Sequence, residues 1–492
     1  MRYAKYKKTG IAWLPEVPNG WEVVSFGRML ETPLTYGASE SGEVEYAPGM
    51  VRYIRITDIT LDGKLKDDGC KYLAFENAKG VMLAKGDVLF ARSGATVGKT
   101  YLFDEDFPAC YAGYLIRASV DRRKLLPNFL IYFTQSYQYN EWKNRIFIQS
   151  TIQNISAAKY GKLPIPLPPL SEQRVIAGYL DEKCGKVDAL VAAKERQVEL
   201  LKEMKQSMIA DAVTKGVGFN AEKQRRREAE NETSRTSRTS REKTKPSGIP
   251  WLPEVPEGWE VRKMKYLFTE RSDKGHPNEP PLCSTQAYGV IPQSKYEGRV
   301  VVVDAKNRDQ LKLVKKGDFV ISLRAFQGGI EIAHYQGIIS AAYTILASKD
   351  EAYSQYFRWL FKSQPFIELL KTCVTGIREG QNINYSLLSR KQLPLPPLAE
   401  QKAIVAHIEE RAAKIDATIS GLQKEISLLK EYRERLIADV VTGQRRVNSS
   451  TNRAVGAVDG SSTNRVVGAA ANNGGAAISA ATKKDTAKGV AR

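Results

Sequence analysis

The chain has 492 residues, enough for two or three domains with cores of their own, and 42% of them are hydrophobic. Seventy-four lysines and arginines outnumber 55 acidic residues, which gives a formal net charge of +19. This excess favours a polyanionic partner such as a nucleic acid. The sequence has no run of about 18 apolar residues, which argues against a membrane-spanning helix.

The first ten residues are basic and contain no apolar stretch, so we expect no signal peptide. No cysteine lies in a C-x-x-C pair, and the cysteines and histidines show no zinc-ligand spacing. These residues are Cys70, Cys110, Cys184, Cys283, Cys373, His276, His334 and His407. We therefore expect a cytoplasmic protein without disulfides or bound metal.

The chain opens with a segment that it repeats later. Gly10–Val23 reads GIAWLPEVPNGWEV, and Gly248–Val261 reads GIPWLPEVPEGWEV, with twelve of fourteen positions identical. A match of this length is not a chance event, so the sequence predicts an internal duplication.

A variable region of mixed character follows the first copy. Val51–Ile59 and Gly86–Arg92 are rich in Val, Ile and Phe and are predicted strands. Pro127–Ser136 is predicted to be a short buried helix, because its aromatic and aliphatic residues recur at helical spacing.

A long helix is predicted after Pro168 and Pro169, extending from Ser171 to Thr214. Its apolar residues recur at a heptad-like spacing, flanked by two valines that widen the stripe. They are Ile176, Leu180, Val187, Leu190, Val191, Val198, Leu201, Met204 and Met208. At about 1.5 Å per residue the helix would be about 66 Å long, which requires a partner for the stripe.

The second half repeats this order after a polar, charged connector at 218–247, which we expect to be flexible. Gly298–Asp304 and Gly317–Leu323 are predicted strands, and Ser354–Ser363 is a predicted helix. Pro394–Thr442 then aligns without a gap to Pro166–Thr214, with 21 of 49 positions identical.

The second helix is the natural partner of the first. Its stripe contains Ile404, Ile408, Ile415, Ile419, Leu422, Ile426, Leu429, Tyr432 and Leu436. The sequence therefore predicts an α+β protein with an internal pseudo-two-fold repeat, in which two mixed α/β domains are joined by two long antiparallel coiled-coil helices. Lys183, Lys194, Arg411 and Thr418 interrupt the stripe, which indicates that part of it serves another protein.

The sequence contains no recognisable nucleotide-binding or methyltransferase motif. Gly94–Thr100 (GATVGKT) has one residue too few between its glycines for a phosphate-binding P-loop, so a tight turn is the better interpretation. An adenine methyltransferase needs an N/D-P-P-Y/F loop, and no Pro-Pro pair here has an Asn or Asp before it. We expect no catalytic residue on this chain.

The order of parts resembles the specificity subunits of type I restriction–modification enzymes, from about Gly10 to Gln444. The features that carry the resemblance are W-L-P-E-V-P-x-G-W-E-V, K-G-D followed by a glycine-containing loop, and L-P-P-L-x-E-Q, in that order and twice. It implies two target-recognition domains that each read half of a split duplex DNA site. It also implies docking of methyltransferase subunits, two in number, and of restriction/translocase subunits, which would carry AdoMet, ATP and Mg²⁺.

On this basis the predicted boundaries are 1–162 and 248–392 for the target-recognition domains, 163–217 and 393–446 for the spacer helices, 218–247 for the linker and 447–492 for a disordered tail. The residues expected at the partner interface open the two helices: Leu170, Glu172, Gln173, Leu398, Glu400 and Gln401.

Base edges are read by Arg, Lys, Asn and Gln, and phosphates are bound by Lys, Arg, Ser and Thr. Polar residues of these types cluster after the K-G-D strands and before the helices. In the first half they are Arg92, Ser93, Thr96, Lys99, Gln149, Thr151, Gln153 and Asn154, and in the second Arg324, Gln327, Arg378, Gln381 and Asn382, with Ser284, Gln286 and Tyr288 as a weaker set.

Two alternatives remain at this stage. A coiled-coil adaptor whose basic domains bind nucleic acid without reading sequence would share the composition, but it gives no reason for two divergent domains. A fused restriction–modification enzyme would need the catalytic motifs that are missing.

Overall fold

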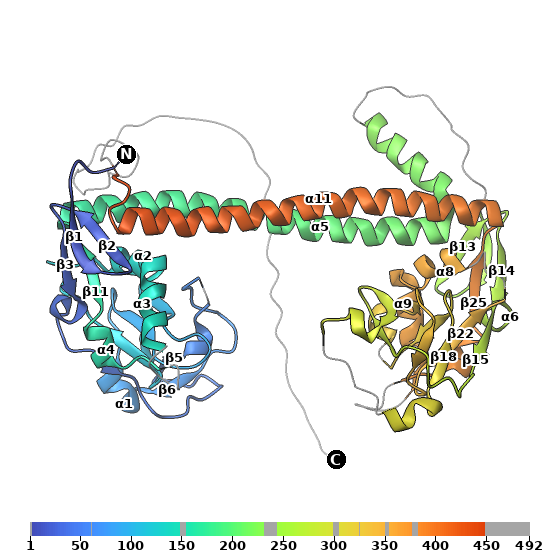
Figure 1. Cartoon of the computed structure of the whole chain (residues 1–492), viewed down its shortest axis with the longest axis horizontal. Helices are drawn as coiled ribbons and strands as arrows, with labels where there is room; N and C mark the ends of the chain where they lie inside the picture. Colours follow the sequence, from blue (N-terminus) through green and yellow to red (C-terminus); the bar gives the residue numbers. More distant parts are fainter. Residues whose placement is uncertain are drawn as a thin grey trace, which may run out of the picture.

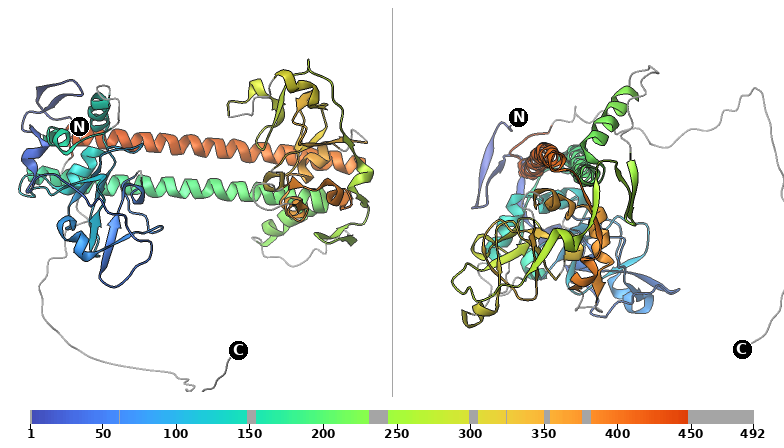
Figure 2. Two further views of the ribbon diagram at one scale, coloured as in Figure 1. Left: turned by 90° about the horizontal axis from the view of Figure 1, so that it is seen from below. Right: turned by 90° about the vertical axis from the view of Figure 1, so that its right-hand side faces the viewer.

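The computed structural model describes residues 2–60, 62–147, 154–230, 244–298, 305–323, 325–349, 354–375 and 382–447. Two globular domains lie at opposite ends of a pair of long helices, and both lie on the same side of it (Figure 1). The end-on view in Figure 2 agrees, since both domains lie beneath the helix pair. The predicted fold class is confirmed.

The helix pair consists of α5 (Leu170–Glu230) and α11 (Leu398–Val441), which run antiparallel (Figure 1). Gly216 breaks the helical geometry of α5 with φ 82° and ψ 178°, a conformation that favours glycine. Helix resumes beyond it as far as Glu230, and strand β12 (Thr244–Ile249) begins at Thr244, so the prediction of a flexible linker at 218–247 is wrong at both ends, while 231–243 lie outside the described residues. Ala, Glu, Lys and Arg in the helical part are good helix formers. The predicted tail lies outside the described residues except for Val447.

The helix seam is confirmed in outline. Ile176, Leu180, Val191 and Val198 on α5 are buried, as are five aliphatic residues on α11: Ile404, Ile408, Ile415, Leu422 and Leu436. Leu190, Met204 and Tyr432 were predicted in the seam, but between 45% and 49% of each is exposed. Heptad spacing places residues beside a seam as well as within it, and the sequence alone does not separate the two.

Ion pairs across the helices reveal the internal symmetry. Residues of the two helices correspond at an offset of 228. Lys205 pairs with Asp416 at 2.6 Å, and their counterparts Arg433 and Asp188 pair at 2.8 Å. The same contact therefore occurs twice, on either side of a pseudo-two-fold axis that passes near Arg196, as the duplication predicts.

The first domain contains a four-stranded sheet in the order β4-β10-β7-β8 and a three-stranded sheet β6-β5-β9, in which β5 and β9 are parallel. Its strands are β1 (Tyr6–Ile11), β2 (Leu14–Pro18), β3 (Glu22–Ser25), β4 (Thr35–Tyr36), β5 (Met50–Ile54), β6 (Tyr72–Ala74), β7 (Val88–Ala91), β8 (Thr100–Leu102), β9 (Ala109–Tyr111), β10 (Leu115–Ala118) and β11 (Pro164–Leu167). Its helices are α1 (Phe75–Ala78), α2 (Pro127–Thr134), α3 (Tyr137–Phe147) and α4 (Ala157–Gly161).

The second domain has the matching four-stranded sheet β15-β22-β19-β20. Its strands are β12 (Thr244–Ile249), β13 (Leu252–Pro256), β14 (Glu260–Lys263), β15 (Phe268–Arg271), β16 (Leu282–Thr285), β17 (Gly289–Pro292), β18 (Lys312–Val314), β19 (Phe319–Ile321), β20 (Glu331–Ile332), β21 (Gly337–Ile339), β22 (Thr344–Ser348), β23 (Val374–Thr375), β24 (Asn382–Ile383) and β25 (Gln392–Leu395). Its helices are α6 (Met264–Leu267), α7 (Ala325–Gly328), α8 (Ser354–Leu360), α9 (Gln364–Lys371) and α10 (Tyr385–Leu388).

The predicted strands and helices of the variable regions mostly occur. The two K-G-D segments form β7 and β19, each central in its sheet, and the predicted aromatic helices are α2 and α8. Val51–Ile59 is a strand only to Ile54, after which a 3-10 turn follows. Most of Gly298–Asp304 lies outside the described residues.

Each domain shares its core with the helix pair. In the first domain Trp21 and Phe129 belong to one cluster with Ile176 and Leu436. In the second, Trp259 and Phe357 cluster with α5 and α11 residues that include Ile209 and Ile404. Because burial of such side chains stabilises by about 1.5–3 kcal/mol each, the domains are fixed on the helix ends.

Candidate nucleic-acid interface

The turn after β7 is tight, as the sequence predicted. Gly94 and Gly98 have positive φ angles of 84° and 82°, and the Val97 amide donates to the Gly94 carbonyl at 3.1 Å. Both glycines adopt backbone geometry that side chains disfavour. Ser93 and Thr96 are half-buried on this turn.

Lys99 has a structural role that the sequence did not reveal. Its ammonium donates to the Ile56 carbonyl at 2.9 Å and to the Ile59 carbonyl at 2.5 Å, and burial lowers its pKa. The nitrogen therefore ties the turn after β7 to the 3-10 turn after β5. The prediction that Lys99 is a free DNA-contacting cation finds no support in this geometry.

The two polar clusters predicted in the first domain come together. The Ile155 amide donates to the Arg92 carbonyl at 2.8 Å, and Ser93 forms an antiparallel bridge with Asn154. The buried Asn154 Oδ1 finds no hydrogen-bond partner among the described residues. Three residues predicted beside it lie outside the described residues: Gln149, Thr151 and Gln153.

Two exposed tyrosines neighbour Arg92, one through its ring and one through its backbone, and sequence reasoning missed them. The Arg92 guanidinium lies over the Tyr36 ring at 4.7 Å from its centroid, and Tyr36 is 42% exposed. The Arg92 amide donates to the carbonyl of Tyr114, whose side chain is 67% exposed. The signal for Tyr114 was present, because Ala112–Ser119 (AGYLIRAS) resembles Ala341–Ser348 (AAYTILAS), which has Tyr343 at the same position.

The second domain shares one of these polar residues, since Asn382 is the counterpart of Asn154, but its other exposed side chains differ. Gln327 on α7 and Asn382 on β24 are exposed, and Gly329 beside α7 has a φ of 88°. Tyr288, at the turn between β16 and β17, is 63% exposed. The other predicted residues, Arg324, Arg378 and Gln381, lie outside the described residues.

Two further segments match between the halves, QNIS at 153–156 and QNIN at 381–384, and the last residue of each caps a helix. Ser156 accepts a hydrogen bond from the Lys159 amide at the start of α4, and Asn384 accepts one from the Leu387 amide at the start of α10. Such caps stabilise helices by about 1 kcal/mol. The segments therefore position the neighbouring Asn154 and Asn382 on a fixed backbone.

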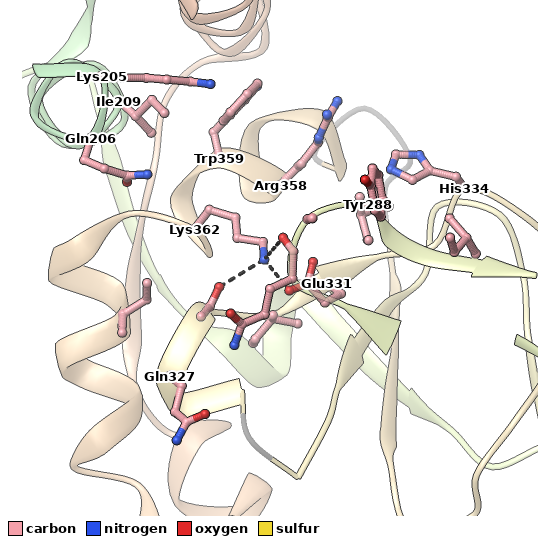
Figure 3. Close-up of a pocket in the computed structure, with 18 of the residues that line it drawn as sticks. Lys205, Gln206, Ile209, Tyr288, Gln327, Glu331, His334, Arg358, Trp359 and Lys362 are labelled. Atoms are coloured by element: carbon pink, nitrogen blue, oxygen red, sulfur yellow. Dashed lines mark hydrogen bonds and ion pairs between the residues drawn. The ribbon is translucent and has the colours of Figure 1, made fainter. Parts of the chain in front are cut away.

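A cleft of about 900 Å³ lies between α5 and the second domain (Figure 3). Cations and aromatic rings line it, and two carboxylates lie within it: Asp416 and Glu331. Burial raises the pKa of Glu331 to about 7, although the Lys362 ammonium beside it acts in the opposite direction. Lys362 also donates to the Gly328 carbonyl at 3.0 Å, which anchors α7.

Three of the residues predicted to contact a partner subunit, Glu172, Gln173 and Gln401, make hydrogen bonds within this chain. Gln173 is fully buried, accepts from the Leu126 amide at 2.8 Å and donates to two carbonyls. Glu172 accepts from Tyr3 and, at 3.0 Å, from the Trp21 indole. Gln401 is equally buried and donates to the Pro396 carbonyl.

These glutamines therefore offer another subunit no surface. Among the remaining members of the set, Leu170 and Glu400 are half-buried and Leu398 is 43% exposed.

The sequence matches, over residues 18–200 and 256–428, the family described as the type I restriction modification DNA specificity domain. The two matched regions cover more than half of the chain. This chain belongs to the type I DNA specificity family.

Individual relatives agree with the family assignment. The chain is 25% identical over 470 residues to a putative type I restriction enzyme MjaX specificity subunit of Methanocaldococcus jannaschii, covering 90% of this chain and 97% of that one. It is 23% identical over 449 residues to the MjaVIII specificity subunit of the same organism, covering 88% and 95%. A solved chain from work on complex assembly and conformational transition of the type I R-M system has the same fold, with a TM-score of 0.62, 16% identity and coverage of 87% and 99%.

The helix pair of this specificity subunit carries exposed apolar side chains on one face. Leu200 and Leu428 occupy equivalent positions and are 48% and 55% exposed. Ile209 lies nine residues after Leu200, and Ile437 lies nine residues after Leu428; both isoleucines are buried against a domain. Nine residues are about two and a half helical turns, so each leucine is on the opposite face of its helix from the isoleucine. The exposed leucines therefore point away from the domains.

Among the described residues, no group of three or more His, Cys, Asp and Glu side chains could hold a metal ion. No helix in the described part of the chain is long and apolar enough to cross a membrane.

Proposed function

We propose that this specificity subunit reads a bipartite duplex DNA target, with one half-site for each domain, and that the helix pair fixes the gap between the half-sites. The observation that supports this most directly is the arrangement of the domains, at opposite ends of the antiparallel pair and on one side of it (Figures 1 and 2). A straight duplex can then contact both domains at once.

Sequence-specific reading is favoured over general binding because the two surfaces differ. The first domain offers Arg92 beside the exposed Tyr36, whereas the second offers the exposed Gln327 and Tyr288 around its own turns; the aligned Asn154 and Asn382 are common to both. Arginine pairs best with guanine, and Asn or Gln with adenine, so these surfaces are suited to different base sequences. A protein that bound only phosphates would gain nothing from this divergence.

Footprinting of the complete chain, assembled with its methyltransferase partner, tests the proposal. The expected result is two protected blocks separated by an unprotected gap of constant length. A non-sequence-specific adaptor would leave no defined site, and that result would reject the proposal.

The proposal includes docking of two methyltransferase subunits on the outward face of the helix pair, with restriction/translocase subunits joining the assembly. The exposed leucines at positions 200 and 428 are related by the pseudo-two-fold axis, and so are Met204 and Tyr432, each 49% exposed. Two equivalent apolar patches suit two copies of one partner. The chain itself would be non-catalytic and would act in the cytoplasm, with AdoMet, ATP and Mg²⁺ bound by those partners.

Copurification measures this docking. Leu200→Ser with Leu428→Ser should reduce the amount of methyltransferase subunit retained on the tagged chain at least tenfold. The matched control is Glu203→Ser with Glu431→Ser, which changes an equivalent, exposed pair on the same helices. Equal retention by the leucine variant and the control would contradict docking on this face.

A further inference from the structure

We infer that the cleft between α5 and the second domain binds the sugar–phosphate backbone of one DNA strand, next to the half-site which that domain reads. The first domain lacks this contact. The inference rests on the proposed function and adds a sequence-independent contact on one side only.

The cleft is placed and sized for such a ligand. Lys205 from α5 lies on one wall, Arg358 and Trp359 from α8 on another, and Tyr288 and His334 from the sheet turns on a third (Figure 3). Its volume of about 900 Å³ matches a small-molecule site, so a whole duplex cannot enter and only the edge of one strand fits.

The charges in the cleft leave a surplus of cations. Lys205 pairs with Asp416 at 2.6 Å, and Lys362 pairs with the buried Glu331. Within each pair the positive and negative charges offset each other. Two further cations line the cleft, Lys295 and Arg358, and among the described residues the only ion pair of either is Arg358 with Glu409 at 3.8 Å. This surplus of positive charge favours the binding of an anion.

Aromatic rings hold these two cations in place. The Lys295 ammonium donates to the Tyr335 hydroxyl at 3.0 Å and lies 4.6 Å from the centroid of that ring. The Arg358 guanidinium lies 5.0 Å from the centroid of the Trp359 ring. Side chains ordered before binding lose less entropy when they contact a phosphate. The exposed Tyr288 adds a ring that can pack against a sugar.

At the corresponding place in the first domain, side chains of the domain and of α11 are hydrogen-bonded to each other. Gln135, the counterpart of Lys362, accepts from Arg433 at 3.2 Å, and Arg433 pairs with Asp188. Ile131 and Tyr132 stand where the second domain has Arg358 and Trp359. In the second domain Lys362 turns to Glu331 instead, away from α5, and the gap stays open (Figure 3).

The salt dependence of DNA binding tests the inference. The full chain, assembled with its methyltransferase partner, is titrated with a duplex that contains the mapped target and with a scrambled duplex of equal length, at several salt concentrations. Each lost phosphate contact should reduce the slope of log K against log salt by about 0.9. Lys295→Gln with Arg358→Gln should therefore reduce the slope by about 2 and weaken binding to both duplexes by the same factor.

Two further variants control for folding and for charge. Lys263→Gln with Lys265→Gln removes two exposed cations at the far edge of the same domain and should leave the slope unchanged. Lys295→Arg with Arg358→Lys keeps both charges and should retain the slope.

An unchanged slope in the Gln variant would overturn the inference, and so would a loss confined to the target duplex, which would indicate base reading. A wild-type chain that does not prefer the target over the scrambled duplex would reject the proposed function. The slopes on the scrambled duplex would still decide whether the cleft binds backbone.

Discussion

Shortening both spacer helices by one heptad should shorten the gap between the two half-sites. The deletion takes 193–199 from α5 and the equivalent 421–427 from α11, on both sides of the pseudo-two-fold axis. The flanking pairs Lys205–Asp416 and Arg433–Asp188 remain in place. Because seven residues complete two turns of a coiled coil, each domain keeps its orientation relative to the helices.

The magnitude follows from helix geometry. Seven residues at about 1.5 Å each bring the domains about 10 Å closer. At about 3.4 Å per base pair this corresponds to up to three base pairs, the upper limit applying when the helix pair lies parallel to the duplex.

Methylation mapping of cells that carry the deleted chain gives the gap directly. Both half-sites should be unchanged, and the gap between them should be shorter by one to three base pairs. A chain that still directs methylation at the original gap would refute the role of the helices as a spacer. Gly421→Ala in the full-length chain is the control, because it changes the same helix without shortening it and nothing lies within 4 Å of the added Cβ. This variant should keep the original gap.

Four further changes test individual residues. Arg92→Gln should weaken binding of DNA that carries the first half-site by about 1–3 kcal/mol and leave binding through the second unchanged, as measured with half-site mutants. Gln173→Ala removes a fully buried amide that bonds the Leu126 amide and two carbonyls, and should lower the free energy of unfolding by about 2 kcal/mol in urea titrations. Gly185→Ala with Gly421→Ala should raise it by about 0.5–1 kcal/mol per site, since both Cβ positions are open. Burial raises the pKa of Glu331 to about 7. Between about pH 4.5 and 7 the folded chain therefore binds more protons than the unfolded chain. As a result, the free energy of unfolding should fall as pH rises through this window. Urea unfolding at pH 5 and 7.5 should show this fall in the wild-type chain and not in Glu331→Gln.

The duplicated sequence was sufficient to predict the architecture. Two long helices with matching apolar stripes have few ways to bury them, and folding one copy back on the other is the simplest. The similarity of the two K-G-D segments likewise indicated two equivalent strands, which are the central strands β7 and β19. The register of the seam was less certain, because Met204 and Leu201 fit a heptad pattern equally well and only packing distinguishes them.

The candidate site was predicted in part. Arg92 and Asn154 were predicted as members of two separate polar clusters, and the structure brings them together through backbone pairing that the sequence did not reveal. The role of Lys99 could not be predicted, since its partners Ile56 and Ile59 are about forty residues away in the sequence. The cleft beside α5 was missed for the same reason: Lys205, Lys295 and Arg358 come from three separate parts of the chain.

Single-molecule sequencing of methylated DNA from cells with and without this chain tests whether the chain selects a bipartite target. We expect a split, asymmetric methyladenine motif that disappears when the chain is deleted and returns when it is restored. A methylation pattern that does not change with the chain, in cells that contain the methyltransferase partner, would contradict this expectation.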